Sequence, residues 1–386
     1  MSDYFSQLST KKISFFIIDY SFGGGVERVT SDLISLFNKS NLPVSELVSL
    51  YSANENPSID YPKDLKINIL NPKSKKELKS IFINYFKTHR PDFFIFQGDN
   101  MTISLAILNA AKKTNTIAIP QYHGSPYAYL RKYPTAEKSL LLKRIWAPLV
   151  LSFKKRKLKT FVNLAKNGIV CVSNGSKKEI RALLGTKATK KIITIYNPLD
   201  IPNYKSNTKT NTISFISRLE SKHKNAFLIA KTWELLSPKH PNWHLNIYGE
   251  GSLKDKLSTY FTERNIKNVS IKGFVKNIQE ELSKSKISLS TSNCEGFSMA
   301  IAEAILNQNA IVSTDSDGGI KDMLIHKKTA LISPKNDANK LCENLDLLIK
   351  NEALSQNLSD NAKIHLSQIT SLNPIEQWKT LLTKML

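Results

Sequence analysis

The chain has 386 residues, enough for two or three domains that each bury a core. An apolar content of 41% with ordinary glycine and proline counts excludes a disordered or fibrous protein. The formal net charge of +23 favours an anionic neighbour, which could be nucleic acid, an acidic membrane surface or a phosphorylated substrate.

Cysteine usage and hydropathy together indicate a cytoplasmic protein. Cys171, Cys294 and Cys342 have no paired spacing, which argues against a disulfide framework and against a zinc site. The first apolar run, Ile13–Tyr20, is too short for an export signal and contains Asp19. No run reaches the roughly 18 uncharged apolar residues that a membrane-spanning helix requires.

The first 200 residues alternate short β-rich runs with amphipathic helical patterns. Helices are predicted at Val29–Asn38 and Leu78–His89. Such a βαβ series predicts a mostly parallel sheet covered by helices on both faces. The predicted strands are Ile13–Asp19, Val44–Tyr51, Ile67–Leu70, Phe93–Gln97, Thr116–His123, Gly168–Val172 and Ile192–Tyr196.

A second series follows a linker at Asn197–Thr212, where periodicity stops and Pro, Asn and Lys gather. We expect an N-terminal domain over 1–200, a C-terminal domain over 201–370, and a helix over 371–386 that packs back on the first domain. The fold class is α/β, with two Rossmann-like, doubly wound parallel-sheet domains facing a cleft, where ligands bind at the strands' carboxyl ends. The second-domain strands are predicted at Ile213–Ser217, His244–Tyr248, Val269–Ile271, Ile287–Thr291, Ala310–Thr314 and Ala330–Ile332.

The most informative motif is Cys294–Ala304 (CEGFSMAIAEA), which places Glu295 and Glu303 eight positions apart after a predicted strand. With Ser298 as N-cap, the first amides of the following helix lack intrahelical partners, so the turn is suited to a phosphate. Glu295 could face the reacting end of a ligand, and Glu303 could accept hydrogen bonds from hydroxyls farther along it. The simpler alternative is two solvated acids.

Two cations are predicted at the start of the second domain. Arg218 follows the strand Ile213–Ser217, and Lys224 lies six residues further on. Arginine can bind a phosphate through two hydrogen bonds, and lysine can neutralise it as a point charge. A solvated basic loop is the alternative in so basic a chain.

Glycines follow several predicted strands. Gly23, Gly24 and Gly25 lie between the first strand and its helix, and they permit positive φ and close backbone approach to a sugar or anion. Their spacing matches neither a dinucleotide fingerprint nor a P-loop, and a tight turn is the alternative. Gly249-Glu250-Gly251, Gly273-Phe274-Val275 and Gly318-Gly319 recur in the second domain. This recurrence suggests one ligand lying across the strand ends.

One histidine and one acidic pair are further candidates for chemistry. His123 ends the strand Thr116–His123, where it could bond a sugar hydroxyl or shuttle a proton, and a structural role is the alternative. No two histidines have metal-ligand spacing. Asp315 and Asp317 have the spacing of a divalent-metal motif but lie beside Gly318-Gly319. We therefore expect no metal and no cofactor.

The segment Arg131–Lys159 has ten Lys and Arg against one acid, Glu137, with Tyr133, Trp146 and Phe153 between them. It is too charged to span a membrane. A basic segment with Trp and Leu is typical of a helix lying on an anionic bilayer. The alternatives are an ordinary helix with a solvated basic face, and a nucleic-acid surface, which is disfavoured because no nucleic-acid module is recognisable.

These motifs resemble the retaining GT-B glycosyltransferases of family 4, the glycosyl transferases group 1. GGVER, RLESKHKN, YGEG and EGFSMAIAEA occur in the family's order along most of the chain, and the E-x7-E spacing is the most specific of them. The departures are Asp322, where members often have Glu, and Ser298, where many have Gly or another small residue.

The resemblance implies a nucleotide sugar held mainly by the second domain and an acceptor on the first. By this likeness Glu303 binds the ribose, Glu295 contacts the transferred sugar, and His123 lies near the reaction. The diphosphate would be held by Arg218 and Lys224 with the amides of Phe297 and Ser298, and the base would lie against Gly273, Phe274 and Val275. These charges could stabilise the leaving nucleoside diphosphate without a metal.

The leading interpretation is a hexosyltransferase or N-acetylhexosaminyltransferase that uses a nucleotide sugar, with UDP expected on family grounds. Its acceptor would be a lipid-linked, lipopolysaccharide or capsule-type glycan, and the enzyme would be peripheral on the inner face of the cytoplasmic membrane. One alternative is a transferase with a soluble acceptor. Another is a non-catalytic basic protein that binds nucleic acid or an anionic glycan.

Overall fold

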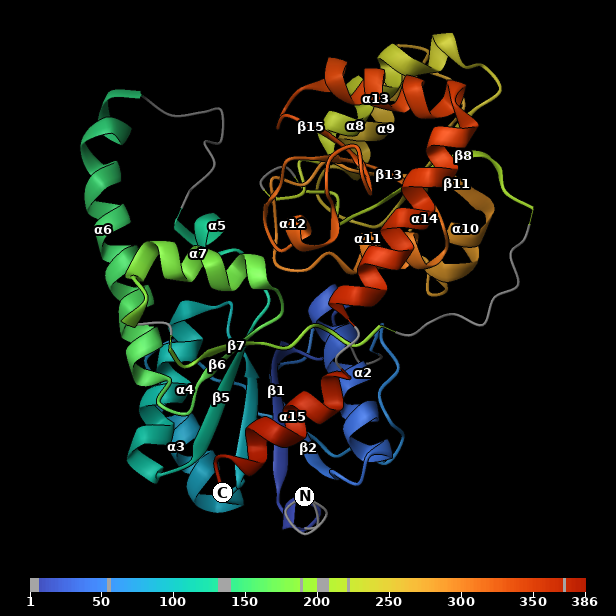
Figure 1. The fold of residues 1–386 in the computed structure, drawn as a ribbon. Helices are drawn as coiled ribbons and strands as arrows, with labels where there is room; N and C mark the ends of the chain where they lie inside the picture. Colours follow the sequence, from blue (N-terminus) through green and yellow to red (C-terminus); the bar gives the residue numbers. More distant parts are fainter. Residues whose placement is uncertain are drawn as a thin grey trace. The chain divides into compact units, whose positions relative to one another are not determined.

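The computed structural model describes residues 7–53, 57–130, 140–187, 190–199, 208–220, 223–370 and 373–386, with backbone only for 140–147. Within these ranges the chain forms two compact units (Figure 1). The first unit contains the residues up to 198 together with those from 373 onward, and the second contains 199–370.

The first unit is built on a seven-stranded sheet in the order β3-β2-β1-β4-β5-β6-β7, in which every neighbouring pair is parallel. Because its strands are buried on both faces, they are almost continuously apolar, as in Phe93–Gln97 (FFIFQ). The strands are β1 (Ile13–Asp19), β2 (Val44–Tyr51), β3 (Ile67–Ile69), β4 (Phe93–Gln97), β5 (Ile117–Tyr122), β6 (Ile169–Cys171) and β7 (Ile192–Thr194).

Helices cover both faces of this sheet. On one face α3, α4 and α6 form a single apolar cluster with Phe94 and Phe96 of β4. On the other, Phe37 of α2 meets Phe15 edge-on at 5.3 Å, and Trp378 of the C-terminal helix meets Phe37 at 5.8 Å, so this helix packs beside α2 (Figure 1). The helices are α2 (Gly25–Lys39), α3 (Leu78–His89), α4 (Met101–Thr114), α5 (Pro126–Leu130), α6 (Leu140–Leu164), α7 (Asn174–Leu184) and α15 (Pro374–Thr383).

The second unit has a six-stranded parallel sheet in the order β10-β9-β8-β11-β13-β15 and a separate two-stranded bridge, β12-β14. Helices α8, α9 and α13 pack with Phe215, Ile247 and Val312 in one apolar cluster. The strands are β8 (Thr210–Ile216), β9 (His244–Tyr248), β10 (Val269–Gly273), β11 (Ser285–Ser290), β12 (Cys294–Glu295), β13 (Ala310–Thr314), β14 (Asp317–Gly318) and β15 (Leu331–Ser333). The helices are α8 (Phe227–Leu236), the 3₁₀ turn η2 (Ser237–Lys239), α9 (Lys254–Glu263), α10 (Ile278–Lys284), α11 (Met299–Leu306), α12 (Ile320–Met323), α13 (Ala338–Lys350) and α14 (Glu352–Ile369).

The predicted α/β class with two parallel-sheet units is confirmed, and the structure corrects details. The predicted linker ran to Thr212, but β8 already begins at Thr210, because its threonines favour strand geometry and Thr210 pairs in register with Ser285. The bridge β12-β14 was not predicted, since two-residue strands carry no periodicity. Residues 200–207 of the predicted linker and 131–139 of the basic segment lie outside the described ranges.

No helix in the described part of the chain is both long and apolar enough to cross a membrane.

Candidate active site

The predicted donor-binding residues gather at the carboxyl edge of the second sheet. Arg218 and Lys224 follow β8, Phe274 follows β10, and the motif with Glu295 and Glu303 follows β11. Because β8, β9, β10 and β11 are parallel, their carboxyl ends meet along one edge. The topology therefore brings to one edge residues that are up to 85 positions apart in the sequence.

At the centre of this edge, Lys224 Nζ lies 2.6 Å from Glu295 Oε1. The same carboxylate oxygen accepts a hydrogen bond from Ser292 Oγ at 2.6 Å. Only 10% of the Glu295 side chain and 29% of the Lys224 side chain is exposed, so the pair is partly shielded from water. Lys224 and Glu295 were predicted as separate ligand contacts, and the structure shows that they also bind each other.

Hydrogen bonds between neighbouring loops hold this pair in place. The amide of Asn293 donates to the carbonyl of His223, and Thr291 Oγ1 donates to the carbonyl of Lys224. Thr314 Oγ1 donates to the carbonyl of Ser292. The backbone on both sides of the ion pair is thus fixed by the loops that follow β8, β11 and β13.

The bridge β12-β14 adds a second support that sequence reasoning missed. Glu295 is in register with Gly318, and its carbonyl accepts the amide of Gly319 at 2.7 Å. Asp317 of β14 pairs with Lys335 at 2.8 Å, with side chains 14% and 23% exposed. Lys335 follows β15, and no local pattern marks it, because its partner is 18 residues earlier.

The helical half of the motif is buried. Glu303 lies on α11 with 5% exposure, and Phe297 and Ser298 are 7% and 6% exposed. Ser298 occupies the predicted N-cap position, but its side chain makes no capping hydrogen bond. The predicted N-cap position is therefore correct.

Cys294, next to Glu295, is a buried thiol. Burial, followed by the neighbouring Glu295 carboxylate, raises the pKa of the Cys294 thiol to about 12. Its Sγ lies 3.2 Å from His223 Nδ1. A thiol with this pKa stays protonated at neutral pH, so it contributes packing and one weak hydrogen bond.

The remaining second-unit candidates are more open. Arg218 is 48% exposed and lies 3.4 Å from Glu220, an ion pair of little energetic weight. Phe274 is 49% exposed beside Gly273, which has φ +72°, with Val275 next in the chain. Gly249 has φ +128°, and a Cβ there would lie 2.0 Å from the carbonyl oxygen of Ser217. The YGEG motif therefore needs its glycines for a structural reason, because the loops after β8 and β9 approach each other closely.

The acidic pair near Gly318 is neutralised by lysines. Asp315 pairs with Lys321 at 2.9 Å, and Asp317 with Lys335 at 2.8 Å. Among the residues that the structure describes, no group of three or more His, Cys, Asp and Glu side chains is placed to hold a metal ion.

In the first unit, His123 follows β5. Its amide and that of Gly124 both donate to Asp99 Oδ1, at 2.9 and 2.8 Å. The ring Nε2 is enclosed and has no hydrogen-bond partner among the described residues. Burial lowers the pKa of His123 to about 3, so the imidazole is neutral at pH 7.

The glycine loop also differs from expectation. None of Gly23, Gly24 and Gly25 has a positive φ, so the loop does not use the left-handed backbone that its glycines permit. Gly24 lacks room instead, because a Cβ there would lie 2.3 Å from Glu27 Oε2 and 3.3 Å from the ring of Phe22. The Glu27 carboxylate therefore lies against Gly24, whereas the Cβ position of Gly25 is open.

Two α/β units with parallel sheets define the GT-B fold, and solved structures of this fold are similar along nearly the whole chain. One is a TarM variant from Staphylococcus aureus in complex with fondaparinux, α-GlcNAc-glycerol and UDP, with TM-score 0.78, 15% identity, and coverage of 97% of this chain and 100% of that one. Residues 197–365 match the family model described as glycosyl transferases group 1.

Two curated relatives are similar in sequence. A poly(ribitol-phosphate) alpha-N-acetylglucosaminyltransferase of S. aureus is 27% identical over 60% of this chain and 47% of its own length. An uncharacterized glycosyltransferase of Haemophilus influenzae is 23% identical over 96% of this chain and 100% of its own. The chain thus spans less than half of the first relative and the whole of the second.

Proposed function

We propose that the protein is a retaining glycosyltransferase that moves a hexose or N-acetylhexosamine from a UDP-sugar to a lipid-linked, lipopolysaccharide or capsule-type glycan. It acts at the cytoplasmic face of the membrane without a metal or other cofactor. The observation that carries this proposal is the Lys224–Glu295 pair, because Glu295 shares one strand–turn–helix unit with the buried Glu303 and Lys224 reaches it from the loop after β8.

The donor chemistry follows from this arrangement. The bond between the sugar and the diphosphate breaks as negative charge develops on the leaving nucleoside diphosphate. Lys224 and Arg218 supply positive charge at that edge, and the amides of Phe297 and Ser298 lie at the start of α11. Lys224 is already oriented by Glu295, so it needs little reorganisation to share its charge with a diphosphate.

The two motif carboxylates then have different roles. Glu303, buried on α11, accepts hydrogen bonds from the ribose hydroxyls of the donor. Glu295 accepts them from the sugar being transferred, and Phe274 with Gly273 and Val275 borders the base. The UDP in the solved TarM complex and the glycosyltransferase relatives support this assignment by similarity.

The acceptor is assigned to the first unit. His123 is neutral at pH 7, so in this proposal it exchanges hydrogen bonds with a sugar hydroxyl and does not act as an imidazolium acid. Gly23, Gly24 and Gly25 border the acceptor. Because Glu27 covers Gly24, the loop suits hydroxyls better than phosphate. The anionic polymer named for the S. aureus relative supports a glycan acceptor.

A panel of UDP-, GDP- and ADP-sugars tests the proposal, with binding and slow hydrolysis measured on the full chain. Glu303→Gln and Arg218→Ala should sharply reduce donor affinity and transfer. Glu280→Gln is the matched control, because Glu280 is a 52% exposed acid on α10 that pairs with Lys284. If no sugar nucleotide is bound or hydrolysed, the enzyme assignment fails. If the enzyme transfers sugar to soluble glycans and not to lipid-linked glycans, the assigned class of acceptor is wrong.

A further inference from the structure

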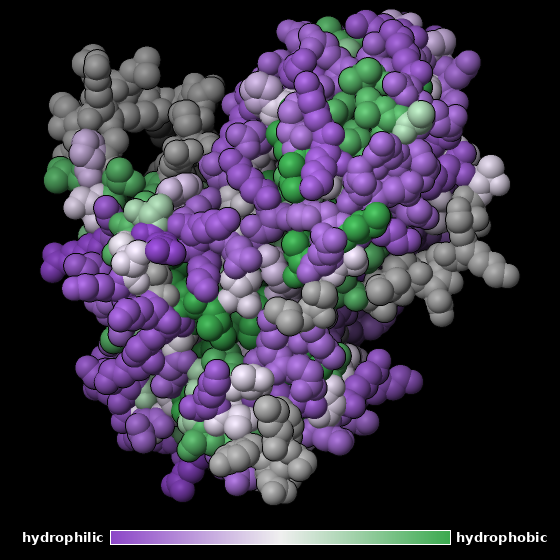
Figure 2. Space-filling view, viewed as in Figure 1, coloured by the Kyte–Doolittle hydropathy of each residue, from purple (hydrophilic) through white to green (hydrophobic). Residues whose placement is uncertain are grey.

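Helix α6 exposes an apolar stretch that nothing in the described structure covers. Leu149, Val150, Leu151 and Phe153 are 62%, 42%, 46% and 59% exposed. Further along the same helix, Leu158, Phe161 and Val162 are buried in the core of the first unit. In Figure 1 the N-terminal end of α6 extends past α7, and Figure 2 shows apolar side chains on this part of the helix.

Two of these exposed side chains do not continue the core face of the helix. At about 100° per residue, Leu149 and Phe153 share one side of α6, which lies about 150° around the axis from the side of Leu158, Phe161 and Val162. Leu151 lies on the core side, and Val150 lies between the two sides. The side of Leu149 and Phe153 is therefore apolar without being used for folding. We call Leu149 and Phe153 the outer stripe.

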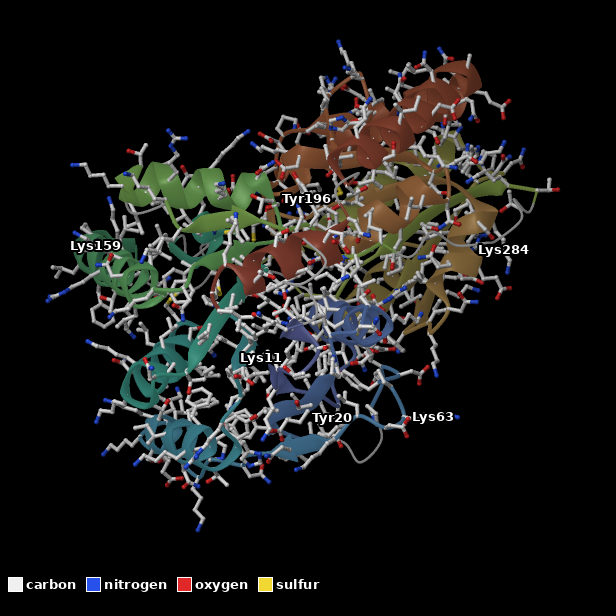
Figure 3. All side chains as sticks on the ribbon, turned by 60° about the horizontal axis from the view of Figure 1, so that its bottom comes forward. Lys11, Tyr20, Lys63, Lys159, Tyr196 and Lys284 are labelled. Carbon is white, nitrogen blue, oxygen red and sulfur yellow. The ribbon has the colours of Figure 1, made fainter. Side chains whose placement is uncertain are left out.

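Two cations flank the outer stripe. By the same geometry Arg156 and Lys157 lie on its side of the helix, and Lys157 Nζ is 4.8 Å from the centroid of the Phe153 ring. Lys155 and Lys159 lie farther away, about 140° and 100° around the axis from the outer stripe, and Lys159 is labelled in Figure 3. Lys154 is engaged within the first unit, because its Nζ donates to the carbonyl of Tyr129 at 2.7 Å.

We propose that the outer stripe docks α6 flat on the surface of an anionic bilayer. Leu149 and Phe153 enter the interface, and Arg156 and Lys157 contact the headgroups. A second copy of this chain is a poorer partner, because pairing two outer stripes would bring four cations together, whereas anionic lipid neutralises them. Docking brings the first unit to lipid-linked acceptors, and in that respect only it rests on the proposed function.

Sedimentation of the full chain with phosphatidylcholine vesicles, with and without phosphatidylglycerol, tests the docking at low salt. Leu149→Asp and Leu151→Asp are a matched pair, the same change two residues apart on either apolar face. Arg156→Glu/Lys157→Glu and Lys155→Glu/Lys159→Glu change the net charge equally. We expect Leu149→Asp and Arg156→Glu/Lys157→Glu to reduce binding to anionic vesicles about tenfold or more, and their partners to do so about twofold or less.

Several outcomes would overturn the proposal. If the wild-type protein does not bind anionic vesicles, the proposal is wrong. If the two charge variants lose vesicle binding equally, the attraction is non-specific and the outer stripe is not the docking surface. Ultracentrifugation that finds a dimer dissociated by Leu149→Asp would assign the outer stripe to a second copy. Circular dichroism must show each variant folded. If vesicle binding follows the stripe while no sugar nucleotide is bound, the proposed function fails and the docking stands.

Discussion

The two sheets of this protein end in carboxyl edges of different character. In the second unit, hydrogen bonds join the loops after β8, β11 and β13, and charged groups face one another, as in Lys224 with Glu295 and Lys335 with Asp317. In the first unit, the edge holds a neutral histidine and a glycine loop beneath Glu27. An edge with fixed cations suits a phosphorylated donor, and an edge with a neutral imidazole and the Glu27 carboxylate suits hydroxyls.

The largest effect is expected at the central ion pair. Lys224→Met should lower transfer by about 100-fold or more, because it removes a cation from the diphosphate and leaves Glu295 without its lysine. Steady-state kinetics measure this loss. The double variant Lys224→Met/Glu295→Gln should regain stability in a thermal melt but not activity, and recovery of activity would contradict a role in catalysis.

The glycines of the two edges should respond differently. Gly249→Ala should destabilise the protein by about 2–3 kcal/mol, because it forces a positive φ on alanine and a Cβ against the carbonyl of Ser217. Gly25→Ala should be close to neutral, since no atom lies within 4 Å of its Cβ position. Denaturant unfolding measures both, and equal costs would contradict the contrast between the edges.

The ion pair between Lys335 and Asp317, which supports the bridge β12-β14, should have an intermediate effect on activity. Lys335→Met and Asp317→Asn should each lower kcat about tenfold, with the double variant no worse than either, because both break one contact. Lys321→Met, which breaks the exposed pair with Asp315, is the control and should have almost no effect. A change confined to the donor KM would instead indicate that Lys335 touches the ligand.

The smallest effect concerns pH. His123 has a pKa of about 3 when folded and about 6.5 when unfolded, so its contribution to stability is complete above pH 6.5 and is lost as pH falls toward 3. Burial raises the pKa of Asp99 to about 6, although its two amide hydrogen bonds lower it. Because its folded pKa is raised, Asp99 favours the folded state as pH falls, which is opposite to the effect of His123. Wild type should therefore lose more stability than His123→Asn between pH 6.5 and 4.5, by up to about 1.4 kcal/mol per pH unit. Denaturant titrations at each pH measure the free energy of unfolding of both proteins. If these free energies change in parallel with pH, the prediction is wrong.

Much of the fold was predictable because local pattern carries it. The strands Ile13–Asp19, Val44–Tyr51, Phe93–Gln97, His244–Tyr248 and Ala310–Thr314 begin and end where apolar periodicity placed them. Buried parallel strands are nearly continuous apolar runs, so their limits are visible without tertiary information. The candidate donor residues were found the same way, since each follows a predicted strand.

The two parallel sheets and the strand–turn–helix carrying Glu295 and Glu303 were predictable from the residue pattern alone, because periodicity and spacing are local properties. Only the tertiary structure paired Lys224 with Glu295 across 71 positions, joined Lys335 to Asp317, and turned the outer stripe of α6 away from the core. Such contacts depend on which loops parallel strands bring together and which helix face meets the sheet, and no local pattern records either.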